Sequence, residues 1–129
     1  PDLRKQLFDN KSSTYTYLVA SNKGREALII DPVIENVDLY IKLLKELGLK
    51  LVKVIDTHIH ADHITGASKL SKATNCTTIM GEHTPSDVVE VKVKDDEIIK
   101  VDGLNIKAIY TPGHTSDSYS FLMDKLLFH

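Results

Sequence analysis

The chain reads Asp56-Thr57-His58-Ile59-His60-Ala61-Asp62-His63-Ile64-Thr65-Gly66 near its middle, with three histidines and two aspartates in one short stretch. The apolar run at 51–55 predicts a buried strand before the cluster, and the segment 67–73 predicts a helix after it. The cluster therefore belongs to a loop between the carboxyl end of a strand and the start of a helix. Imidazole and carboxylate groups at this density indicate a metal site rather than a solvated polar loop.

The spacing of the cluster suits metal binding. Alternate side chains of an extended segment point to one side, so His58 and His60 are expected to lie together. Asp62 and His63 follow where the backbone turns toward the helix, and their side chains can turn back. Imidazole suits zinc and iron, while carboxylate supplies a harder oxygen ligand. The pattern therefore predicts either one metal ion or two adjacent ones.

A second loop carries another candidate ligand. The segment 104–110 alternates like a half-buried strand and ends in Thr111-Pro112-Gly113-His114-Thr115. Proline and glycine predict a tight loop that presents His114 at the strand end, much as the first cluster is presented. His83 lies in a polar loop with no second ligand nearby, so we expect it to have no metal role.

Composition bounds the class of protein. The 129 residues are 42% hydrophobic and 26% charged with a formal net charge of −2. These values are typical of a soluble globular domain and favour neither nucleic acid nor a membrane as partner. No apolar run approaches the roughly 18 residues of a membrane span, and the first residues lack a signal-peptide core, so we expect a cytoplasmic protein. The single cysteine, Cys76, is expected to be structural.

The remaining pattern alternates strands and helices. Asn36 and Gly48 are the expected caps of an amphipathic helix between them. Its apolar stripe comprises Val37, Leu39, Ile41, Leu43, Leu44 and Leu47. The acidic run 94–97 is expected to be a solvated turn rather than a cation site. Strands are expected at 3–9, 14–20, 26–31, 49–55, 77–80, 88–93, 98–101 and 104–110, with a final hairpin of 118–123 and 126–128.

The two loops together resemble the metallo-β-lactamase superfamily. The resemblance rests on T-H-x-H-x-D-H-x-x-G at Thr57 to Gly66 and on T-P-G-H-T at Thr111 to Thr115. It implies an α/β fold, the αβ/βα sandwich, with a metal at one edge between two sheets. Residues 1–129 would form the N-terminal part of that domain. Within the superfamily the chain is similar to the persulfide dioxygenases, on the pattern of residues 13–18, 30–33 and 58–66.

This resemblance implies an iron(II) enzyme that oxidises glutathione persulfide with dioxygen to sulfite and glutathione. His58 and His114 match two of the family's iron ligands, and His60 is a further candidate. The third family ligand is an aspartate that follows a strand like 125–128, where this chain has His129 in place of an expected threonine or serine. With one metal, Asp62 and His63 would act catalytically by orienting ligands and handling protons. In glyoxalase II, which has two metals, the same positions bind metal directly.

Three functions remain open on the sequence. Persulfide dioxygenation at one Fe(2+) is favoured by the Tyr15-Thr16-Tyr17 strand and by Ala61 in the cluster. Thioester hydrolysis of the glyoxalase II type, with paired Zn(2+) or iron, is the alternative; in both, the partner is glutathione persulfide or another glutathione-linked molecule. A catalytically incomplete module is the third.

Because the chain is short for this fold, we expect it to form a homo-oligomer or to belong to a longer polypeptide. In a eukaryote, the mitochondrial matrix is an expected location besides the cytoplasm.

Overall fold

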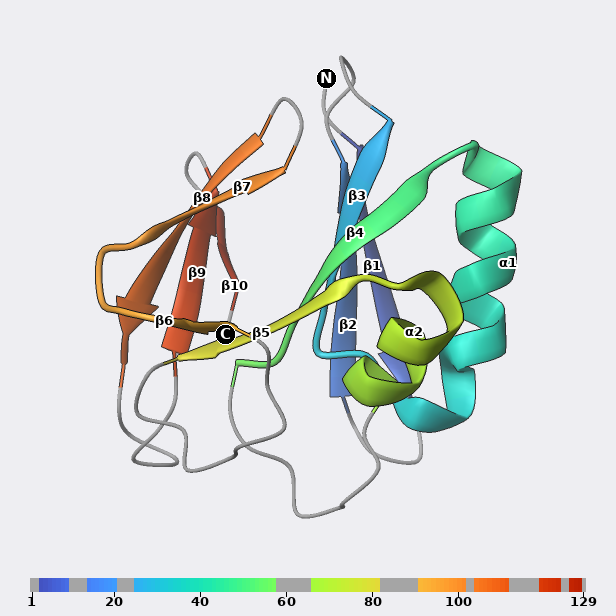
Figure 1. Ribbon diagram of the computed structural model, residues 1–129, viewed down its shortest axis with the longest axis horizontal. Helices are drawn as coiled ribbons and strands as arrows, with labels where there is room; N and C mark the ends of the chain where they lie inside the picture. Colours follow the sequence, from blue (N-terminus) through green and yellow to red (C-terminus); the bar gives the residue numbers. More distant parts are fainter. Residues whose placement is uncertain are drawn as a thin grey trace.

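The computed structural model describes residues 3–9, 14–20, 25–57, 66–81, 91–101, 104–111, 119–123 and 126–128. Within these ranges the chain forms three layers (Figure 1). A layer of two helices lies against one face of a six-stranded sheet, and a four-stranded sheet lies on the opposite side. The described part of the chain therefore has an α/β/β arrangement, with one buried interface on each side of the larger sheet.

The larger sheet runs in the order β1-β2-β3-β4-β5-β6. The first three strands pair antiparallel, and the pairs from β3 to β6 are parallel. The strands are β1 (Leu3–Asp9), β2 (Thr14–Ala20), β3 (Glu26–Ile30), β4 (Lys50–Ile55), β5 (Thr77–Gly81) and β6 (Val91–Val93). Parallel neighbours need crossover connections, and the two helices lie in those from β3 to β4 and from β4 to β5.

Both helices cover the same face of this sheet (Figure 1). A short 3-10 turn, η1 (Ile34–Asn36), leads into α1 (Val37–Leu47), which connects β3 to β4. The second helix, α2 (Gly66–Thr74), stands between β4 and β5. Crossovers between parallel strands are right-handed, and β3, β4 and β5 follow one another in one direction across the sheet. Both helices must then fall on one face, which leaves the other face for the second sheet.

The smaller sheet is antiparallel throughout, in the order β10-β9-β8-β7. Its strands are β7 (Ile98–Val101), β8 (Leu104–Tyr110), β9 (Tyr119–Met123) and β10 (Leu126–Phe128). The exposed turn 94–97 carries the chain to it from the larger sheet. In that turn the Asp95 carboxylate accepts a hydrogen bond of 2.8 Å from the Tyr110 amide, which ties the turn to β8.

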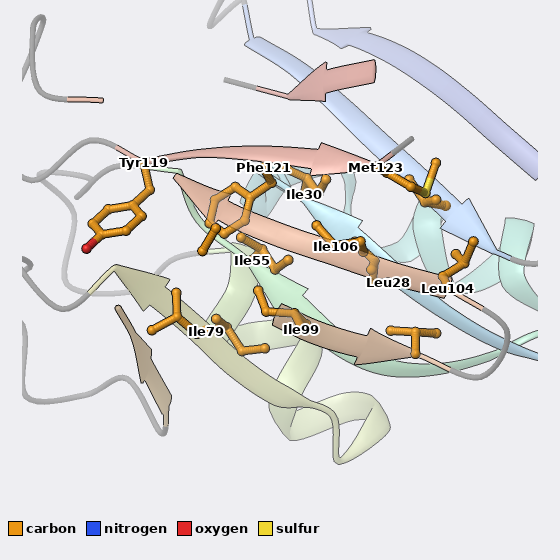
Figure 2. Packing of buried hydrophobic residues seen from close by; sticks show 14 residues of the cluster. Leu28, Ile30, Ile55, Ile79, Ile99, Leu104, Ile106, Tyr119, Phe121 and Met123 are labelled. Carbon is orange, nitrogen blue, oxygen red and sulfur yellow. The ribbon is translucent and has the colours of Figure 1, made fainter. Parts of the chain in front are cut away.

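Two apolar clusters fill the two interfaces. Strand β3 contributes to both, because alternate residues point to opposite faces and both faces are covered. Ala27 and Ile29 face the helices, whereas Leu28 and Ile30 face the second sheet. Figure 2 shows the cluster between the sheets, where Ile106 and Phe121 meet side chains from the larger sheet. These interfaces hold the carboxyl ends of β3, β4 and β8 at fixed relative positions.

Most of the predicted elements are confirmed. The strands over 3–9, 14–20, 98–101 and 104–110 have the expected bounds, and the final hairpin forms by antiparallel pairing of β9 and β10. The turn 94–97 is exposed as expected. Cys76 is buried among the helix-facing residues, as a structural cysteine should be. Neither described helix has the length and apolar composition needed to span a bilayer.

The helix 37–47 is correct in extent but partly wrong in its buried face. Leu39 was expected in the apolar stripe but is 52% exposed, whereas Tyr40 is 2% exposed. Gly48 ends the helix in the left-handed conformation, as expected. Asn36 occupies the N-cap position, but its side chain makes no capping hydrogen bond, because the 3-10 turn η1 runs directly into the helix. Tyr40 becomes important for the site.

Candidate metal centre

All of the predicted site residues lie outside the described residues. His58, His60, Asp62 and His63 belong to the segment 58–65, here called the first histidine loop. His114 belongs to the segment 112–118, called the second histidine loop. Their predicted roles therefore stay predictions, as does the dispensability of the histidine at 83. Within the described ranges no group of three or more histidine, cysteine, aspartate or glutamate side chains could hold a metal ion. What the structure does describe is how the ends of both loops are held.

The residue before the first histidine loop is bound to a buried carboxylate. Asp31 follows β3, and its side chain accepts two hydrogen bonds from Thr57, which precedes His58. The Thr57 amide lies 2.8 Å from one carboxylate oxygen, and the Thr57 hydroxyl lies 2.7 Å from the other. Asp31 is 6% exposed and Thr57 is 3% exposed. Hydrogen bonds to a buried charge are stronger than neutral ones, so this pair fixes the start of the loop.

The residue after the same loop meets the same turn. Gly66 opens α2 against the backbone of residues 31–34, which we call the platform turn. A Cβ atom at Gly66 would lie 2.5 Å from the Pro32 carbonyl oxygen and 3.2 Å from the Ile34 nitrogen. Only glycine permits this approach of helix to turn. The platform turn therefore contacts the chain immediately before and immediately after the first histidine loop.

The second histidine loop is bounded by neighbouring antiparallel strands. Tyr110 and Tyr119 are directly paired across β8 and β9, and their ring centroids are 5.3 Å apart. The hydroxyls of Thr111 and Ser120, which follow Tyr110 and Tyr119 in the chain, meet diagonally across the two strands at 2.8 Å. Figure 2 shows Tyr119 at one end of the cluster between the sheets, with its hydroxyl pointing away from the other labelled side chains.

One backbone hydrogen bond joins the two loops across the sheets. The Tyr119 amide donates to the Thr57 carbonyl at 2.8 Å. Thr57 directly precedes the first histidine loop, and Tyr119 directly follows the second. The loops that carry His58 and His114 therefore have adjoining ends, at the carboxyl end of β4. Imidazole and carboxylate groups, which both loops' sequences offer, are ligand types that suit a zinc or iron ion.

The structure changes the interpretation of two aspartates near the predicted cluster. Asp56 was counted among the two carboxylates of the predicted cluster, but it is 5% exposed and continues β4, with its amide donating to the Ile79 carbonyl at 3.1 Å. Asp31 was interpreted only as the end of a strand before Pro32. Its φ of 55° is unusual for a residue other than glycine. An aspartate directly before proline was the one available signal, and it did not indicate which residue the carboxylate would bind.

Comparison with known proteins agrees with this geometry. The family model of the metallo-beta-lactamase superfamily matches residues 9–129. The chain therefore belongs to the metallo-beta-lactamase superfamily. The predicted α/β fold of that superfamily is confirmed, since the helix layer and the two sheets match solved members.

Individual members of the superfamily are similar to most of this chain. The chain is 36% identical over 125 residues to the mitochondrial persulfide dioxygenase ETHE1 of Bos taurus, covering 96% of this chain and 49% of the relative. It is 34% identical over 128 residues to a hydroxyacylglutathione hydrolase of Rhodopseudomonas palustris, covering 95% of this chain and 49% of the relative. The crystal structure of ETHE1 from Myxococcus xanthus superposes with a TM-score of 0.91 at 40% identity, covering 97% of this chain and 55% of that one. The chain thus spans about half the length of the curated relatives it matches.

Proposed function

We propose that this chain is part of a persulfide dioxygenase that oxidises glutathione persulfide with dioxygen to sulfite and glutathione at a single non-haem iron. The atoms balance when glutathione persulfide anion, dioxygen and water give glutathione, sulfite and one proton. The outer sulfur is oxidised and dioxygen is reduced, while water supplies the third oxygen of sulfite. Residues 1–129 then belong to one metallo-β-lactamase-like domain.

The observation that carries the proposal is the hydrogen bond between the Tyr119 amide and the Thr57 carbonyl. It places one end of each histidine loop beside the other. His58 and His114 then lie on loops short enough for both to bind one ion in this proposal. His58, His114 and one carboxylate would hold the iron, which would supply binding positions for dioxygen and a persulfide sulfur. By resemblance the third ligand is an aspartate that follows a strand like β10.

The remaining polar residues of the first loop take supporting roles in this proposal. His60, Asp62 and His63 orient the ligand imidazoles through hydrogen bonds, which commonly changes metal affinity by 10- to 100-fold. Asp62 and His63 also accept and return the protons that the reaction moves. The buried Asp31 carboxylate holds Thr57, and thereby the start of the loop that carries all three residues.

Thioester hydrolysis is the second candidate, favoured by the 34% identity to a hydroxyacylglutathione hydrolase over nearly the same residues. In that case His60, Asp62 and His63 would bind metal directly beside His58 and His114. Two adjacent ions would then supply a hydroxide for attack on the thioester carbonyl. The two candidates share a glutathione-linked substrate and differ in the number of metal ions and in the use of dioxygen.

Two assays on a full-length form separate the candidates. An oxygen electrode with glutathione persulfide should record uptake, and a glutathione thioester should be hydrolysed slowly or not at all. Metal analysis should find one iron per chain. Rapid thioester hydrolysis without oxygen uptake, with two metals per chain, would instead establish the hydrolase. A protein with neither activity and no bound metal would be the incomplete module.

Alanine substitutions test the ligand assignment. His58→Ala and His114→Ala should each abolish iron binding, because removal of one of three protein ligands usually destroys such a site. His83→Ala is the matched control and should retain the iron content of the wild type. Bound iron per chain is the measurement, and equal losses at His58 and His83 would contradict the assignment.

A further inference from the structure

Two buried hydroxyl groups lie behind the platform turn and contact it on both sides of Pro32. Thr16 comes from β2 and Tyr40 from α1, and they are 1% and 2% exposed. The Thr16 hydroxyl donates to the Asp31 carbonyl at 2.7 Å, and the Val33 amide donates to the Tyr40 hydroxyl at 3.0 Å. The two hydroxyl oxygens are 3.2 Å apart. Elements far apart in sequence therefore meet at one turn.

The direction of each hydrogen bond in this group follows from the number of donors. A hydroxyl has one proton to donate, and Thr16 uses its proton for the Asp31 carbonyl. The bond between the hydroxyls must then be donated by Tyr40 to Thr16. The result is a continuous chain from the Val33 amide through Tyr40 and Thr16 to the Asp31 carbonyl. It begins and ends on the platform turn, so it closes a ring around Pro32.

This ring supports a backbone conformation that local sequence does not favour. Asp31 has a φ of 55°, in the left-handed region that residues with a Cβ atom rarely adopt. From that conformation its carboxylate reaches Thr57, while Pro32 and Ile34 meet Gly66. Such conformations persist only where the surrounding structure holds them. The ring and the bond from the Asp31 amide to the Ile55 carbonyl, at 2.8 Å, are among the contacts that hold this one.

We propose that Thr16 and Tyr40 are positioning residues for the first histidine loop, acting through the platform turn. This inference rests on the proposed metal site, since its consequence is tighter metal binding. The ring holds the turn, the turn holds Thr57 and Gly66, and these two residues bound the loop that carries His58. Loss of either hydroxyl weakens the support of the turn, and through it that of Thr57 and Gly66, so we expect iron to bind less tightly.

The test uses a full-length form with Thr16→Val and Tyr40→Phe, which remove one hydroxyl each and keep the side-chain shape. Thr16→Ser is the conservative variant, because it restores the hydroxyl. Thr74→Val is the matched control. Its hydroxyl also donates to a backbone carbonyl at 2.7 Å, within α2 and away from the platform turn.

Two measurements report positioning rather than overall stability. Ferrous iron affinity, measured by competition with a chelator, should fall roughly tenfold in Thr16→Val and in Tyr40→Phe, at the lower end of the range for groups that orient metal ligands. Amide hydrogen exchange on the metal-free protein should accelerate at Thr57 more than at Asp56, whose amide bonds to the Ile79 carbonyl across β4 and β5. Thr16→Ser and Thr74→Val should stay within about twofold of the wild type in affinity.

The outcomes separate this inference from the proposed function. Iron affinity in Thr16→Val and Tyr40→Phe equal to that in Thr74→Val would overturn it, and so would equal acceleration of exchange at Thr57 and Asp56. If the wild type hydrolyses thioesters or binds no iron, the proposed function fails. The comparison of exchange at Thr57 and Asp56 then still decides whether Thr16 and Tyr40 position the start of the loop.

Discussion

The two histidine loops are held at their ends by different kinds of interaction. The first directly follows Thr57, which binds the buried carboxylate of Asp31 through two hydrogen bonds. The second lies between the directly paired Tyr110 and Tyr119, followed by a neutral hydroxyl pair, Thr111 with Ser120. One loop therefore depends on a charged side chain from elsewhere in the chain, and the other on the ladder of the strands it joins.

The difference follows from what each loop connects. Antiparallel strands joined by one loop share a hydrogen-bond ladder up to the loop, so their ends are already at a fixed distance. The first loop instead leads from a strand to a helix, which share no ladder. Its two ends need a third element, and the platform turn supplies it by binding Thr57 and packing against Gly66. Substitutions that remove the supports of the first histidine loop should therefore lower the free energy of unfolding more than substitutions beside the second.

The largest effect is expected for Asp31→Ala. It removes the carboxylate that accepts from the buried Thr57 amide and hydroxyl, and it places alanine at a φ of 55°. We expect the free energy of unfolding to fall by about 3 kcal/mol, combining loss of hydrogen bonds to a charged group with left-handed strain. Urea titration measures it. Asp31→Asn should lose less, because asparagine tolerates this conformation and keeps one acceptor oxygen; an alanine loss below about 1 kcal/mol would refute the role of the carboxylate.

A smaller loss is expected for Gly66→Ala. The added Cβ would lie 2.5 Å from the Pro32 carbonyl oxygen, so helix and turn must separate, at about 2 kcal/mol. Thermal or urea unfolding gives the value, and metal affinity should fall with it. Gly48→Ala is the matched control. Unlike Gly66, Gly48 has a positive φ, of 67°, and among the described residues its Cβ would meet an arginine side-chain atom at 3.4 Å, at the end of α1 that lies away from the platform turn. Metal affinity reduced equally in both variants would contradict the platform turn as a specific support.

The smallest effect is expected for Thr111→Val. Thr111 is exposed, and the strand pairing of Tyr110 with Tyr119 remains, so the loss should be about 0.5–1 kcal/mol, that of one neutral hydrogen bond. A double-mutant cycle with Ser120→Ala isolates the coupling of the two hydroxyls. If Thr111→Val costs as much as Asp31→Ala, the two loops do not differ in how they are held.

Sequence periodicity predicted most elements because each has one clear pattern. The alternation of 104–110 and the capping glycine at 48 were sufficient for a strand and a helix end. The same reasoning predicted the buried face of α1 less well. Leu39 was expected inside as the more apolar side chain, yet Tyr40 is buried, because its hydroxyl finds partners in Thr16 and Val33. Hydropathy alone does not predict a partner from another element.

The sequence indicated one part of the candidate site, the ligand residues, but not the residues that support them. The ligand types and their spacing are local properties, so the sequence alone indicated a metal site with His58 and His114 as candidate ligands. The residues that hold the loops were not identifiable, because Asp31, Thr57 and Tyr119 act through contacts between distant segments. Asp31 and Thr57 are 26 residues apart in the chain. The parallel pairing of β3 with β4 brings Asp31 to Thr57, and the packing of the second sheet brings Tyr119 to the same place.

By itself the sequence determined most of the elements, the family and the types of ligand present in the two histidine loops. Periodicity, capping and ligand spacing depend only on residues close together in the chain. The tertiary structure alone decided which ends of these loops adjoin and what holds them. It placed both helices on one face, as right-handed crossovers require, and left the other face to the second sheet. That arrangement brings the Tyr119 amide to the Thr57 carbonyl, and the ring through Thr16 and Tyr40 to the platform turn, because buried polar groups must find their partners across the core.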